Sequence, residues 1–212
     1  MDRPVLIIHG FGATRNSPWI ETLRRKFIEA GYEKSDIHMM DYSDNGIPWT
    51  SVGSPRRYAE NLKKKVRKIL YGKKGRQEEN LEEVNIVAHS MGGLVARWYI
   101  EELDGGKNVN KLITLGTPHR GTEMAKLTFW TAGAKSMIPK NEFIKELNSS
   151  PLAKGVKYVA VWSKVDELVV PSERAKLEGA KNVHPGLFTH IYLPMAQKVF
   201  DEAILSELDR DD

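Results

Sequence analysis

A short apolar run that ends beside a serine constrains the fold of this chain most. The run at 84–88 precedes Ser90 by one residue, and a helical pattern begins directly after the serine. A sharp strand-to-helix turn exposes such a serine and leaves room only for small residues two positions away on either side. Those positions hold Ala88, where glycine is usual, and Gly92. The pattern predicts a nucleophile elbow; the alternative is a serine that caps a helix after a strand.

Apolar runs alternate with helical patterns along the whole chain. Strands are expected at 4–8, 37–42, 84–88, 112–115 and 156–162, and helices from residues 17–18, 54–55, 91 and 194. This alternation is typical of a mostly parallel, doubly wound α/β sheet with helices on both faces. With 212 residues, the chain is long enough for one such domain, spanning 1–212, and too short for two.

Composition excludes several kinds of site. The chain has no cysteine, so disulfides, thiol catalysis and zinc–thiolate sites are absent. The mean hydropathy is −0.44, and no apolar run is long enough to cross a membrane. The amino terminus lacks the pattern of a secretory signal, which favours a cytoplasmic protein, although a secreted protein with its signal removed would look the same. The localisation therefore stays unknown.

The net charge of +4 is modest and does not favour nucleic-acid binding. Basic runs at 63–68 and 73–76 precede acidic residues at 78–83. We expect a solvated helix face and loop there; the alternative is weak attraction to an anionic lipid surface.

A serine hydroxyl needs an adjacent base, which is itself oriented by an acid. In this architecture the acid follows the serine along the chain and stands at the end of a strand. The run at 156–162 leads into Asp166 and Glu167. Asp166 is the predicted acid, and Glu167 is the alternative.

Three histidines downstream of the elbow compete for the role of base. His119 precedes the acid and so breaks the expected chain order. His184 comes too early in the chain to stand in a loop after a short last strand, whereas His190 stands just before the final helix. His190 is therefore the predicted base, and His184 is expected to be a structural loop residue.

The tetrahedral intermediate of acyl transfer needs two backbone N–H donors. Met91 follows the nucleophile and supplies one donor. The loop after the first strand contains Gly10, Phe11 and Gly12, and its glycines let the backbone bend beneath a substrate. Phe11 is the predicted second donor.

These residues resemble those of the α/β-hydrolase superfamily, particularly small bacterial lipases with an Ala-His-Ser-Met-Gly elbow. The resemblance runs through 5–11, 84–97, 112–122, 166–171 and 182–190. It implies an α/β-hydrolase fold and gives Ser90, Asp166 and His190 the roles of nucleophile, acid and base, with Phe11 and Met91 as oxyanion donors. The reaction of such enzymes requires no cofactor.

Residues 122–154 depart from the smallest of these lipases, which have almost no lid. The insertion could form a small cap, with acyl-pocket residues Phe129, Trp130, Met137 and Ile138; the alternative is a surface excursion that packs its own apolar residues. Trp19 and Trp49 are further candidates beside the oxyanion loop, although tryptophan more often packs in a core.

No metal site is predicted. Asp36, His38 and Asp41 lie close together, but on a strand Asp36 and His38 would point to one face and Asp41 to the other.

The chain is thus expected to be a serine carboxylic-ester hydrolase that acts on small-molecule or lipid esters, with transient contact to a lipid interface as a further expectation. Three alternatives remain open: an acyltransferase or thioesterase with the same triad, a non-catalytic hydrolase scaffold that binds a ligand, and a peripheral lipid-binding protein. The oligomeric state and the preferred acyl length are not predicted.

Overall fold

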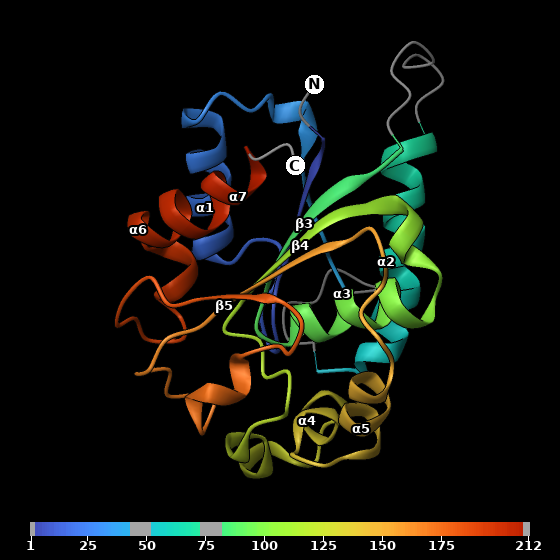
Figure 1. Cartoon of the computed structure of the whole chain (residues 1–212), viewed down its shortest axis with the longest axis vertical. Coiled ribbons are helices and arrows are strands. Elements are labelled where there is room, and N and C mark those ends of the chain that lie inside the picture. Colours follow the sequence, from blue (N-terminus) through green and yellow to red (C-terminus); the bar gives the residue numbers. More distant parts are fainter. Residues whose placement is uncertain (1–2, 43–51, 73–81, 210–212) are drawn as a thin grey trace.

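The computed structural model describes residues 3–42, 52–72 and 82–209, so Trp49 and the basic run 73–76 lie outside the described residues. The strands in the described part form one parallel sheet in the order β2-β1-β3-β4-β5-β6 (Figure 1). They are β1 (Val5–Ile8), β2 (Ile37–Met39), β3 (Val84–His89), β4 (Val109–Leu115), β5 (Lys157–Val161) and β6 (Lys181–Val183).

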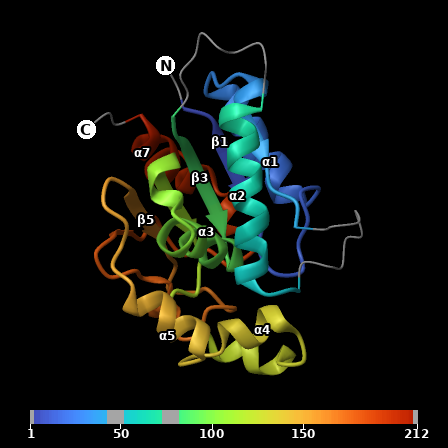
Figure 2. The ribbon, with the colours of Figure 1, turned by 90° about the vertical axis from the view of Figure 1, so that its right-hand side faces the viewer.

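Helices cover both faces of the sheet, as Figures 1 and 2 show. One face carries α2 (Pro55–Tyr71) and α3 (Met91–Glu102). The other carries α1 (Pro18–Glu29) and a C-terminal helical region. That region runs through α6 (Gln197–Val199), a π-helical turn (Phe200–Leu205) and α7 (Ser206–Leu208). The predicted doubly wound α/β architecture is confirmed.

Strand β1 shows why both faces must be covered. Its four residues are all fully buried. Leu6 and Ile8 belong to the core beneath α2 and α3, whereas Val5 and Ile7 belong to the core beneath α1 and the C-terminal helices. Alternate side chains of a strand point to opposite faces, so an uninterrupted apolar run needs an apolar layer on each side.

The segment between β4 and β5 forms three short helices: a 3-10 helix (Glu123–Thr128), α4 (Ala132–Met137) and α5 (Glu142–Ser149). In Figure 2, α4 and α5 lie beyond the carboxyl end of the sheet, toward which β3 points. Helix α5 is fixed to α3 by stacking of Phe143 on Trp98, with ring centroids 5.1 Å apart. The Arg56 guanidinium lies 4.2 Å from the centroid of the same Trp98 ring, which ties α2 to this contact.

Several element ends differ from the prediction. The expected strand 37–42 stops at Met39, and β4 begins at Val109, three residues earlier than predicted. Ser17 begins α1 as expected, but its hydroxyl accepts a hydrogen bond from the Thr14 N–H at 3.0 Å and does not cap the helix. Among the described residues, no helix combines the length and apolarity that a membrane span requires.

Candidate active site

Ser90 stands at a strained turn between β3 and α3. Its backbone has φ 55° and ψ −129°, a conformation that non-glycine residues rarely adopt. The Ser90 N–H donates to the Leu115 carbonyl at 2.9 Å, and the Ser90 carbonyl accepts from the Thr117 hydroxyl at 2.9 Å. Contacts from β4 and from the loop after it therefore hold the turn in place.

Close packing explains the small residues around the serine. A β-carbon at Gly92 would lie 2.6 Å from the His9 carbonyl oxygen, and one at Gly93 would lie 2.1 Å from Thr117 Oγ1. Ala88 is fully buried within β3. The turn thus has the steric requirements that the sequence pattern predicts for a nucleophile elbow.

Asp166 and His190 meet beside this turn, although 24 positions separate them in sequence. His190 Nδ1 lies 3.0 Å from Asp166 Oδ1 and 2.9 Å from Asp166 Oδ2, and both residues are buried. A carboxylate only accepts hydrogen bonds, so Nδ1 carries a proton and donates it to Asp166, which leaves Nε2 as the ring nitrogen not bound by the carboxylate. Asp166 Oδ1 also accepts from the N–H groups of Leu168 and Val169, at 3.0 and 2.8 Å, and these bonds hold the carboxylate in place.

The serine and the histidine are not directly hydrogen-bonded to each other. Among the described residues, Ser90 Oγ makes no hydrogen bond to His190. The ring of His89, the neighbour of Ser90, lies 4.6 Å from the His190 ring, measured between centroids. Catalytic hydrogen bonds are often long in unliganded enzymes and shorten when substrate binds.

The loop after β1 lies directly against the nucleophile. A β-carbon at Gly10 would be 2.8 Å from Ser90 Cβ and 3.3 Å from Ser90 Oγ, so only glycine permits this approach. In the described part of the chain, the backbone N–H groups of Phe11 and Met91 have no hydrogen-bond acceptor. Met91 is also the first residue of α3, where the helix dipole favours negative charge. Two unpaired donors thus stand next to the serine.

The alternative acid and base lie elsewhere. Glu167 makes no hydrogen bond to the His190 ring and instead accepts one from the His190 backbone N–H at 2.9 Å. His184 packs edge-on against Trp162, with centroids 4.8 Å apart. The prediction that His184 comes too early to follow the last strand is wrong. The last strand is β6, Lys181–Val183, so His184 follows it directly. Among the described strands, β6 lies at the edge of the sheet and pairs with β5.

The predicted acyl-pocket residues lie in different packing environments. Trp19 is buried in the core beneath α1, where it contacts the ring of His89. Met137 and Ile138 pack into the core on the opposite face. Phe129 and Trp130 are 57% and 68% exposed, and the centroids of their rings lie 5.9 Å apart. Each of these side chains packs against different neighbours, and the sequence alone does not reveal those neighbours.

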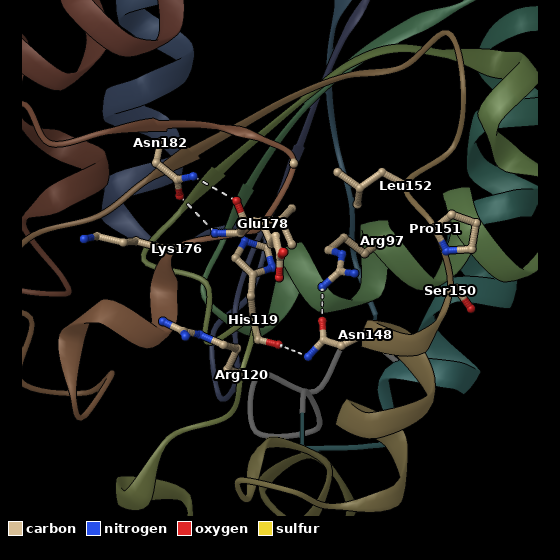
Figure 3. Close-up of a pocket in the computed structure, with 12 residues that line it drawn as sticks. Arg97, His119, Arg120, Asn148, Ser150, Pro151, Leu152, Lys176, Glu178 and Asn182 are labelled. Carbon is tan, nitrogen blue, oxygen red and sulfur yellow. Dashed lines mark hydrogen bonds between the residues drawn. The ribbon is translucent and has the colours of Figure 1, made fainter.

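A cavity of about 680 Å³ is drawn in Figure 3, and its lining does not include Ser90, Asp166 or His190. Its walls include Arg97, whose guanidinium donates to Asn148 Oδ1 at 3.0 Å, while the Asn148 amide donates to the His119 carbonyl at 2.9 Å. Sequence reasoning did not anticipate this cavity. Its lining residues come from distant segments: Arg97, His119, Arg120, Asn148, Ser150, Pro151, Leu152, Lys176, Leu177, Glu178, Gly179 and Asn182.

Among the described residues, no cluster of three or more histidine, aspartate or glutamate side chains is arranged to bind a metal.

Residues 4–146, or 143 of the 212 residues, match the sequence profile of the palmitoyl protein thioesterase family. The matched region includes Ser90 and ends before Asp166 and His190. Triacylglycerol lipase 2 of Saccharomyces cerevisiae is 38% identical over 65 residues. That stretch is 30% of this chain and only 18% of the length of the yeast protein.

Solved structures of lipases and esterases have the same fold. A Bacillus licheniformis lipase has a TM-score of 0.72 at 18% identity, with 94% of this chain and 89% of that chain covered. Aspergillus fumigatus lipase B has a TM-score of 0.69 at 17% identity, covering 89% and 48%. A Pyrococcus furiosus esterase has a TM-score of 0.62 at 19% identity, covering 98% and 80%. At these identities the likeness shows the α/β-hydrolase fold.

Proposed function

The chain belongs to the palmitoyl protein thioesterase family, and from this premise we propose that it is a serine hydrolase that cleaves carboxylic acyl esters. Ser90 is the nucleophile, His190 the general base and Asp166 the acid that orients the base. The observation that carries this proposal is the bond of the Asp166 carboxylate to His190 Nδ1, at 2.9 and 3.0 Å, beside a serine with φ 55°.

In the first half of the reaction, His190 Nε2 takes the proton of the Ser90 hydroxyl while Oγ attacks the ester carbonyl carbon. Asp166 stabilises the imidazolium that forms and keeps the proton on Nδ1. The tetrahedral intermediate collapses to an acyl-enzyme, and His190 gives its proton to the leaving alcohol. Water then attacks the acyl-enzyme with the same base, which releases the acid and restores the serine.

The negative oxygen of each tetrahedral intermediate accepts hydrogen bonds from the N–H groups of Phe11 and Met91. Support for this role comes from the unpaired state of both donors and from the close approach of Gly10 to Ser90. Loss of one such donor typically lowers kcat by about 10²–10³-fold.

Thioester cleavage is the second candidate activity, favoured by the family match over residues 4–146. The same triad serves both reactions, since only the leaving group differs. The test compares nitrophenyl esters from acetate to palmitate with palmitoyl thioesters, using Ser90→Ala as the blank. Selectivity for the long thioester would assign the family activity to this chain, whereas comparable or higher ester rates would assign it ester hydrolysis.

A serine-directed phosphonate tests the triad independently of the substrate. We expect it to label Ser90 and to label neither Ser90→Ala nor His190→Ala. Labelling of another serine, or ester turnover by Ser90→Ala, would refute the proposed nucleophile. Added alcohols separate hydrolysis from acyl transfer, because a transferase would release the alcohol ester in place of the free acid.

We also infer that residues 122–154 form a small cap on a single domain and contact lipid esters. Support comes from α4, where a β-carbon at Gly133 would lie 3.1 Å from the sulfur of Met91, and from the exposed side chains of Phe129 and Trp130. On this reading Trp130→Ser lowers the rate on palmitate emulsions several-fold and leaves the rate on soluble acetate unchanged. Equal effects on both substrates would argue against the cap.

A further inference from the structure

Two neighbouring carboxylates bind the same histidine at different atoms. Asp166 accepts from the ring Nδ1 of His190, whereas Glu167 Oε2 accepts from its backbone N–H at 2.9 Å. The sequence leaves these two residues as competitors for one role. The structure gives each a separate hydrogen bond, and the one made by Glu167 restrains the main chain that carries the imidazole.

His89 binds the other side of the same peptide backbone. His89 Nε2 lies 3.1 Å from the His190 carbonyl oxygen. A carbonyl oxygen only accepts, so Nε2 of His89 must carry the proton and donate it. Burial is the main cause that keeps the pKa of His89 well below 6.5, with a smaller contribution from the neighbouring His190, so the His89 ring stays neutral. Trp19 contacts this ring edge-on at 5.1 Å and limits its rotation.

The loop that carries His190 needs such restraint. It follows the short edge strand β6 and exposes Leu187 and Ile191, on either side of the buried histidine. Ser163 Oγ accepts from the Phe188 N–H at 2.8 Å and ties down an earlier part of the loop. At His190 itself, the N–H and the carbonyl are both bound by side chains rather than by a strand or a helix.

We propose that Glu167 and His89 clamp the main chain of His190 and so position its imidazole between Asp166 and Ser90. They are positioning residues for the proposed ester hydrolysis, and this inference rests on that function. Because His89 is the immediate neighbour of Ser90, the clamp also links the nucleophile turn directly to the loop of the base. A displacement of about 1 Å at a reacting group lowers catalytic rates by up to about 10²-fold.

The test uses paired substitutions at each clamp residue in the full chain. Glu167→Met removes the acceptor, whereas Glu167→Gln keeps an acceptor oxygen on a side chain of the same length. His89→Phe removes the donor but keeps a ring, whereas His89→Gln keeps an N–H donor. Glu178→Met is the matched control, because Glu178 is also an exposed carboxylate on the connection from β5 to β6.

With nitrophenyl butyrate, we expect Glu167→Met and His89→Phe each to lower kcat about tenfold, with KM changed less than twofold. The two glutamine variants should regain most of the lost kcat, and Glu178→Met should match the wild type. A loss that appears in KM, that persists in both glutamine variants, or that is absent from Glu167→Met would overturn the clamp. If His89→Phe does not fold, Glu167→Met and Glu167→Gln decide alone, since residue 167 is exposed.

Ser90→Ala in the same assay separates the two hypotheses. If Ser90→Ala is inactive and the clamp variants are as fast as the wild type, the clamp fails and the proposed function stands. If Ser90→Ala retains activity, the proposed function fails.

Discussion

Replacing Ser90 by glycine should stabilise the protein while abolishing ester hydrolysis. Ser90 has φ 55° and ψ −129°, and a non-glycine residue held in such a conformation costs about 1–3 kcal/mol. Glycine adopts it without that strain, but its freedom in the unfolded chain costs about 0.5–1 kcal/mol. The difference leaves Ser90→Gly more stable by about 1 kcal/mol, which raises the Tm of a domain of this size by about 2–4 °C.

Ser90→Ala is the matched reference, because alanine removes the hydroxyl but keeps the β-carbon that strains the turn. The hydroxyl makes no hydrogen bond in the described part of the chain, so its loss alone changes stability little. Urea unfolding and thermal melts of both variants measure the strain directly, and ester assays confirm that both are inactive. If Ser90→Gly were less stable than Ser90→Ala, the turn would store no strain and the reasoning would be refuted.

Three further substitutions probe the site and its support. Gly10→Ala should lower kcat about 10²–10³-fold, because the added β-carbon would lie 2.8 Å from Ser90 Cβ and would displace the oxyanion loop. A kcat within twofold of the wild-type value would contradict this prediction. Arg97→Met should lower the free energy of unfolding, measured in urea, by about 3–5 kcal/mol, because it removes the positive charge that lies 2.9 Å from the buried Glu101 carboxylate. The double variant Arg97→Met with Glu101→Leu should recover part of that loss. Burial keeps the pKa of His119 well below 6.5, so the unfolded chain binds more protons there and the folded protein loses stability as pH falls below 6.5. His119→Gln should reduce the slope of the free energy of unfolding against pH by at most about 1.4 kcal/mol per pH unit, measured by urea unfolding at several pH values. An unchanged slope would show that His119 does not contribute to this loss of stability.

Strand β1 could be predicted from the sequence because all of its side chains are apolar. The start of β4 could not, because Asn110 and Lys111 interrupt the apolar pattern. Lys111 is nevertheless only 3% exposed, and its ammonium group donates to the Glu207 carbonyl oxygen at 2.6 Å. A partner 96 positions away thus satisfies a buried charge, and no local pattern contains that information.

Chain order was sufficient to bring Asp166 and His190 together as a predicted pair, since both follow strands whose carboxyl ends meet at one edge of the sheet. Order could not separate the tasks of Asp166 and Glu167, because the distinction depends on which atom of His190 each reaches. Position in the sequence also could not show how the predicted pocket residues pack. Trp19 and Met137 are both apolar and suitably placed in sequence, but they pack on opposite faces of the sheet.

The short edge strand β6 has a consequence for how the enzyme loses activity. Ser90 is built on β3 and on α3, most of whose residues are buried, whereas His190 depends on a loop that follows three residues paired on one side only. Proteins open in parts, and elements with few buried contacts open first. Rising denaturant should therefore separate the base from the nucleophile before the central sheet melts, so inactivation precedes the loss of far-ultraviolet circular dichroism.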